Sequence, residues 1–116
     1  MKSLLIASTL SLLVASSVVA ADRKTEEALM IVGAAADLIS TEIALGHGLV
    51  EINPLGQRRW QRVTLKAAST SLGIYVARKL EKHGHERIAR VMRYIHIGTG
   101  FGAAAWNVQA TIRWGE

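Results

Sequence analysis

One acidic side chain lies in the middle of an otherwise apolar stretch. Asp37 has apolar neighbours at 34–36 and 38–39. A bare carboxylate in hydrocarbon costs about 2.5–3.5 kcal/mol or more, so we expect this one to be paired or protonated. Lys66, the amine within a second apolar stretch, is its expected partner, and Thr41 adds a hydroxyl one turn along. Such a pair can form an ion or proton site, a catalytic carboxylate, or an ion pair that holds two helices in register, and we favour the last.

Three further polar residues follow at helical spacing. Thr70 lies four residues after Lys66, and His96 and Asn107 are three turns apart on one helical face. The sequence therefore predicts a polar interior built from six side chains: Asp37, Thr41, Lys66, Thr70, His96 and Asn107.

A short polar motif, Glu51-Ile-Asn53-Pro54, follows the first apolar stretch. Asparagine is a favoured N-cap and proline a favoured first helical residue, so Asn53 and Pro54 predict the start of a helix. Glu51 is expected to fold back over free backbone amides or to bind a nearby arginine. A second interpretation places Glu51 in one site with Asp37.

Turn residues divide the chain into three segments with helical periodicity, at about 26–46, 54–82 and 86–113. None alternates with a period of two for long, and alanine is frequent, so strands are not expected. Each segment has a narrow polar-and-small face and a wide apolar remainder, the inverse of a soluble bundle. We therefore predict an all-α fold, an antiparallel three-helix bundle that crosses the membrane. A soluble exported bundle with ordinary polar faces is the alternative.

The third segment has a second stripe of small residues, formed by Gly98, Gly102 and Ala105. Small residues allow helices to approach closely in lipid. We expect this stripe to serve helix packing or contact with a protein partner or a second copy of the chain.

Residues 1–21 resemble a secretory signal peptide. Lys2 precedes an apolar stretch, and the run from Val18 to Ala21 fits the small-residue pattern of a cleavage site. An uncleaved membrane anchor is the alternative. Residues 22–116 then form the bundle, and the expected location is the bacterial inner membrane, with the periplasm as the alternative.

Composition removes several classes of protein. The chain has no cysteine, and half of its residues are hydrophobic, which excludes a disulfide scaffold, a cysteine-ligated metal site and a disordered chain. His83 and His85 flank a tight turn, but two ligands are too few for zinc. We expect no metal and no other cofactor.

The net charge of +5 is concentrated in residues 78–93, which carry six cations and two acids. This segment lacks aromatic interleaving, so contact with anionic lipid headgroups is favoured over nucleic acid. Basic loops prefer the cytoplasm, whereas cleavage of a signal peptide would leave this loop outside. The sequence leaves the orientation open.

The Asp37-x-x-x-Thr41 helix followed by the Glu51-x-Asn53-Pro54 loop resembles a family of small bacterial and phage membrane proteins of unknown function. The resemblance covers roughly residues 28–112. It implies a hydrophobic helical protein in a membrane, and no activity.

The function predicted from these features is that of a small non-enzymatic integral membrane protein. It would act as an accessory, assembly or interaction subunit of the bacterial or phage-modified envelope. An intramembrane enzyme or ion-translocating protein that uses Asp37, Glu51 and Lys66 is the first alternative, and a soluble exported bundle is the second.

Overall fold

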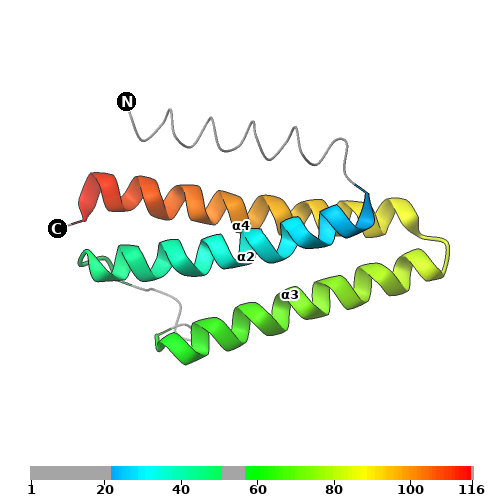
Figure 1. The fold of residues 1–116 in the computed structure, drawn as a ribbon, viewed down its shortest axis with the longest axis horizontal. Coiled ribbons are helices and arrows are strands. Elements are labelled where there is room, and N and C mark those ends of the chain that lie inside the picture. The colour runs from blue at the N-terminus through cyan, green and yellow to red at the C-terminus, as the bar shows by residue number, and fades with distance from the viewer. Residues whose placement is uncertain (1–21, 51–56, 116) are drawn as a thin grey trace.

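The computed structural model describes residues 22–50 and 57–115, which form three α-helices: α2 (Arg23–Gly46), α3 (Arg59–Lys82) and α4 (Glu86–Trp114). These described residues contain no strand, so the all-α prediction is confirmed. Figure 1 shows α2 and α4 side by side along their length, with α3 returning beside them. Among the described helices, α2 alone is long and apolar enough to cross a membrane by length and composition.

Helix α2 begins at Arg23, three residues earlier than predicted. Asp22 is the N-cap, and its side chain accepts a hydrogen bond of 2.8 Å from the backbone N–H of Thr25. The predicted start at about residue 26 missed this cap, although an acidic N-cap is a common helix signal. The same hydrogen bond holds the carboxyl pKa of Asp22 below its usual value.

Helix α3 begins at Arg59 rather than near residue 54, so the predicted start of this helix is wrong. The side chain of Gln61 accepts a hydrogen bond of 3.0 Å from the backbone N–H of Arg58 and satisfies a donor that the helix leaves free. The motif residues Glu51, Asn53 and Pro54 lie outside the described part of the chain, as does the segment 1–21.

A tight turn joins α3 to α4 and makes them antiparallel. Gly84 has a φ of 86°, a left-handed conformation that glycine adopts without strain. The backbone N–H of His85 donates a hydrogen bond of 2.8 Å to the carbonyl of Leu80, which closes the turn. The turn predicted at Gly84 is therefore present.

The core is built mainly from small side chains. Met30 and Ile97 are the largest apolar side chains that are fully buried, and the rest of the apolar core is alanine: Ala44, Ala77, Ala89, Ala104, Ala105 and Ala110. Helices α2 and α4 touch at their backbones, because a Cβ placed on Gly100 would lie 2.7 Å from the carbonyl carbon of Gly33. This close approach makes α2 and α4 the most extensive helix pair.

The predicted packing stripe of the third segment is only partly correct. Ala105 is buried, but Gly98 and Gly102 are exposed, and a Cβ on either would have no heavy atom within 4 Å. Gly100 takes the packing role instead, because it lies on the face of α4 that meets α2. Gly98 and Gly102 lie on the other side of the helix.

The large apolar side chains lie on the outside. Ile39 on α2, Leu72 on α3 and Ile95 on α4 are each 61% exposed. Similar side chains surround them on all three helices, among them Ile31, Val32, Ile43, Val63, Leu65, Val91, Val108 and Ile112. The bundle therefore has an apolar exterior and a core of small and polar groups.

Replacing Gly100 by alanine should separate α2 from α4. The new Cβ would overlap the backbone of Gly33, and overpacking of this kind costs about 1–3 kcal/mol. The control Gly102→Ala meets open space and should raise stability by about 0.5–1 kcal/mol through helix propensity. Thermal unfolding followed by circular dichroism measures both, and equal effects of the two changes would contradict the backbone contact.

Candidate functional site

A polar cluster lies where the three helices meet, in the half of the bundle away from the α3–α4 turn. The Nζ atom of Lys66 on α3 lies 2.6 Å from Oδ2 of Asp37 on α2. The amide nitrogen of Asn107 on α4 donates to the other carboxylate oxygen at 3.2 Å. The predicted ion pair is present, and Asn107 extends it to the third helix.

Two hydroxyls complete this central cluster, which we define as Asp37, Ser40, Thr41, Lys66 and Asn107. The amide nitrogen of Asn107 lies 2.9 Å from the Thr41 hydroxyl and 3.1 Å from the Ser40 hydroxyl. Thr41 also donates to Asp37 at 3.4 Å. Sequence reasoning missed Ser40, although its position one turn before Ala44 on the inward face of α2 was a usable signal.

The other two predicted interior residues lie nearer the α3–α4 turn. Thr70 is buried one turn from Lys66. The ring of His96 packs against Gly73, where an added Cβ would lie 2.5 Å from Nε2. Within the described chain, neither side chain forms a hydrogen bond with the central cluster, so the predicted six-residue interior divides into two levels.

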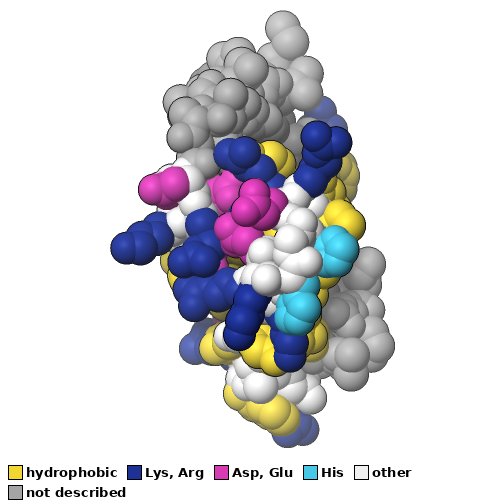
Figure 2. All heavy atoms as spheres, turned by 90° about the vertical axis from the view of Figure 1, so that its right-hand side faces the viewer, with side chains coloured by type: hydrophobic (Ala, Val, Ile, Leu, Met, Phe, Trp, Pro, Cys, Tyr) yellow, Lys and Arg dark blue, Asp and Glu magenta, His cyan; other side chains and the backbone are white. Residues whose placement is uncertain are grey.

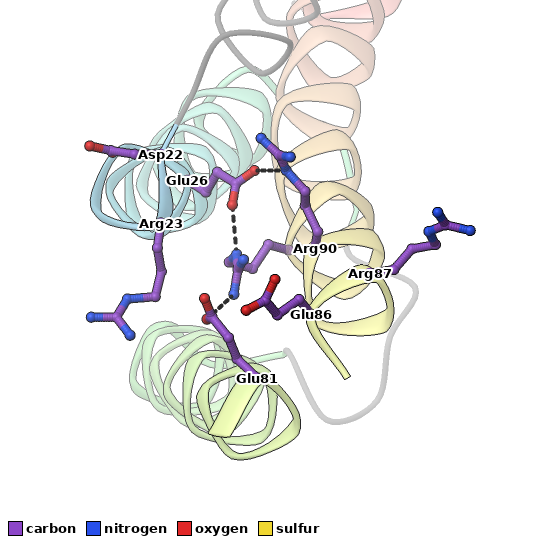
Figure 3. Close-up of a pocket in the computed structure, with 8 residues that line it drawn as sticks. Asp22, Arg23, Glu26, Glu81, Glu86, Arg87 and Arg90 are labelled. Carbon is purple, nitrogen blue, oxygen red and sulfur yellow. Dashed lines mark hydrogen bonds and ion pairs between the residues drawn. The ribbon is translucent and has the colours of Figure 1, made fainter. Parts of the chain in front are cut away.

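A second polar cluster lies at the end of the bundle that carries the α3–α4 turn. Glu26 on α2 accepts hydrogen bonds from Arg93 at 2.8 Å and from Arg90 at 3.1 Å, both on α4. Arg93 also reaches Glu81 on α3 at 3.2 Å, and it is only 3% exposed. Figure 3 shows these groups converging from all three helices.

A bidentate pair extends this cluster. Arg78 on α3 donates to the two carboxylate oxygens of Glu27 at 2.6 and 2.7 Å. We call the whole group the turn-end network, and its members are Glu26, Glu27, Arg78, Glu81, Arg90 and Arg93. Seen from this end, acidic side chains gather at the centre and basic side chains surround them (Figure 2).

The turn-end network was not predicted from the sequence. Glu26 and Glu27 lie at the start of the first predicted helical segment, and both are buried. Residues 78–93 were interpreted as a basic loop, but Arg78, Arg90 and Arg93 are paired with carboxylates, and Arg93 is buried. The cations Lys79, Lys82 and Arg87 remain on the exposed surface. The spacing of Arg90 and Arg93, one helical turn apart, was the available signal.

A cleft of about 360 Å³ opens beside this network. Its lining residues include four arginines and four acids, so the cleft is balanced in charge. Arg23 and Arg87 are directed away from the ion pairs in Figure 3. Because the central carboxylate of Glu26 already has two guanidinium partners, the cleft offers no free nucleophile or base at its centre.

A third ion-pair group lies at the opposite end of the bundle. Glu42 on α2 accepts from Nε of Arg62 at 2.9 Å and from Nε of Arg59 at 3.1 Å, both on α3. Glu42 thus binds the neighbouring helix at the end of the bundle opposite the α3–α4 turn. The reason is that α3 starts with arginines at the level of the last turn of α2.

The described residues contain no group of three histidine, aspartate or glutamate side chains arranged to hold a metal ion. Comparisons with family models, curated proteins and solved structures find no match for this chain. Its functional interpretation therefore depends on the arrangement of its own side chains.

The central ion pair should show strong coupling when its members are removed one at a time. Lys66→Leu leaves the Asp37 carboxylate without its cation and should lower the free energy of unfolding by up to about 3 kcal/mol. This is the lower end of the range for breaking a buried ion pair, because both side chains keep some exposure. The double variant Asp37→Ala, Lys66→Leu leaves no unpaired charge and should be more stable than either single variant. A double-mutant cycle from thermal unfolding measures this coupling, and additive costs would show that the two groups do not interact.

The turn-end network should depend on Arg93 more than on any exposed cation near it. Arg93→Met removes the shared partner of Glu26 and Glu81 and should cost about 3 kcal/mol or more. The matched control Arg87→Met removes an exposed arginine one to two turns away and should change stability by less than about 0.5 kcal/mol. A comparable loss in both variants would mean that the burial of Arg93 adds nothing.

Proposed function

We propose that this protein is a small, non-enzymatic integral membrane protein that acts as an accessory, assembly or interaction subunit of a bacterial or phage-modified envelope. The observation that carries the proposal is the polarity of the bundle. Its large aliphatic side chains face outward on all three helices, while its ion pairs and small residues lie between the helices. In lipid this arrangement buries each charge against a partner and exposes side chains that hydrocarbon solvates.

Water would favour the opposite arrangement. Exposed aliphatic side chains on α2, α3 and α4 form apolar surface on every helix, and soluble monomers rarely expose large contiguous apolar patches. Several of the charges that make α3 and α4 less hydrophobic than α2 are neutralised within the bundle. Lys66 is paired with Asp37, and Arg93 with Glu26. Three spans are therefore compatible with the modest hydropathy of α3 and α4.

Aromatic side chains support the same assignment. Trp60 lies at the start of α3, and Trp114 lies at the end of α4, at the same end of the bundle, where both are exposed. Trp106 approaches Trp114, with ring centroids 6.4 Å apart. Tryptophan is enriched at membrane–water interfaces because its ring is apolar and its N–H is polar. At the other end, exposed Lys79, Lys82 and Arg87 are suited to anionic headgroups.

An ion- or proton-translocating role for Asp37 and Lys66 is the second candidate. The observation that favours it is the position of the pair about two turns inside the helix ends, since ionisable groups within membrane spans often mark a pathway. Both carboxylate oxygens of Asp37 are already engaged, one by Lys66 and the other by Asn107. We therefore assign the pair a structural role first. The proposed subunit role leaves the exposed face around Gly98 and Gly102 for a protein partner.

Membrane extraction and topology mapping test the proposal. The protein should stay in the membrane pellet after carbonate extraction, because its apolar exterior needs lipid. Reporter fusions at Gly56 and Glu116 should report one side of the membrane, and a fusion at Gly84 should report the opposite side. Of these three positions, only Gly84 follows an odd number of the helices α3 and α4 after Gly56. Release into the supernatant, or the same side for all three reporters, would reject the membrane bundle.

A further inference from the structure

A groove of about 320 Å³ runs between α2 and α3, the helix pair with the least direct contact. Its walls are mostly apolar, with Ile31, Ala35 and Leu38 on α2 and Val63, Ala67 and Ile74 on α3. Its polar lining residues are Lys66, Thr70 and Ser71, all on α3. The volume lies at the lower end of the ~300–1,000 Å³ typical of small-molecule sites. The groove is thus large enough for one slender apolar ligand.

The longer wall of the groove, on α3, is close in length to the thickness of one leaflet of a bilayer. From Val63 to Ile74 the wall on α3 covers eleven residue steps, or about 17 Å at ~1.5 Å per residue. Half of a ~30 Å hydrocarbon core is about 15 Å. An extended acyl chain of one leaflet would therefore lie along the groove from end to end.

The end of the groove beside Val63 has a positive charge at headgroup level. Arg59 precedes Val63 by one turn on the same face of α3, and Glu42 follows Leu38 by one turn on α2. These two side chains bind each other across the end of the groove at 3.1 Å.

Arg59 and Arg62 share the single carboxylate of Glu42, which leaves a net charge of +1 among these three side chains, and Arg58 directly precedes Arg59 in the chain. Only Nε of Arg59 contacts Glu42, and the arginine side chain is 77% exposed. Its other N–H groups can therefore donate to a second anion, such as a phosphate.

We propose that this groove binds one acyl chain of an anionic phospholipid, whose phosphate is held by Arg58 and Arg59. The inference rests on the membrane location proposed above and adds the class of lipid and its place on the protein. The apolar walls select the chain, and the excess of arginine at the mouth selects an anionic headgroup over a zwitterionic one.

Trp60, which follows Arg59 directly and is 62% exposed, provides a built-in reporter. The chain has three tryptophans, so the full chain with Trp106→Phe and Trp114→Phe keeps Trp60 alone. This protein, in detergent micelles, is titrated with phosphatidylglycerol or phosphatidylcholine carrying brominated acyl chains, which quench nearby tryptophan. We expect phosphatidylglycerol to quench Trp60 at several-fold lower concentration than phosphatidylcholine.

Two pairs of variants separate the headgroup contact from the groove. Arg58→Gln and Arg59→Gln should each reduce the preference for phosphatidylglycerol about five-fold, whereas Arg113→Gln, at the same end of the bundle but on α4, should leave it unchanged. Ala67→Leu, which fills the groove, should weaken quenching by both lipids. Ala68→Leu, on the next residue and outside the groove lining, should not.

Equal quenching by the two lipids, or an equal loss of preference in Arg113→Gln and Arg59→Gln, would overturn the proposal. So would unchanged quenching in Ala67→Leu. Flotation of the same protein with phosphatidylcholine vesicles and with phosphatidylglycerol vesicles keeps the two proposals apart. A chain that floats but shows no lipid preference loses only the groove site, whereas a chain that floats with neither lipid loses the membrane assignment too.

Discussion

The carboxylate of Asp37 is the group around which the middle of the bundle is organised. It lies between helices whose outer surfaces are apolar, so its charge has to be balanced from within. Lys66 supplies the cation from α3, and Asn107 supplies an amide from α4. Because α2 and α3 otherwise have little direct contact, this ion pair is the main link between them at that level, and the groove beside it stays open.

At both ends of the bundle, too, charged side chains are balanced by partners on neighbouring helices. Arg93 joins Glu26 to Glu81 at the turn end, and Glu42 joins Arg59 to Arg62 at the other. Between these levels α2 and α4 need no side chains to meet, since Gly33 and Gly100 bring the backbones together. Ion pairs, small residues and an apolar exterior are thus parts of one arrangement that suits a hydrocarbon surrounding.

Sequence periodicity was sufficient to predict those contacts that depend only on which face of a helix a residue occupies. It placed Asp37 and Lys66 inward and identified them as partners. It was not sufficient for Glu26 with Arg93, or for Glu42 with Arg59, because those pairs depend on how far one helix is shifted and rotated against another. For α2 and α4, that shift accompanies the backbone approach of Gly100 to Gly33, and periodicity alone does not give the distance between two helices. The start of α3 at Arg59 was missed for a local reason, the cap made by Gln61.

The outward orientation of the aliphatic side chains is the central claim, and the absence of cysteine allows a direct test by single-cysteine spin labelling. Labels are placed at Ile39, Leu72 and Ile95, one on each helix and equally exposed, with Lys82 at the turn as the reference. In reconstituted vesicles, the three helix labels should relax faster with oxygen, which concentrates in lipid, than with a water-soluble nickel complex, and the label at Lys82 should do the reverse. Fast relaxation of all four labels by the nickel complex would contradict the account.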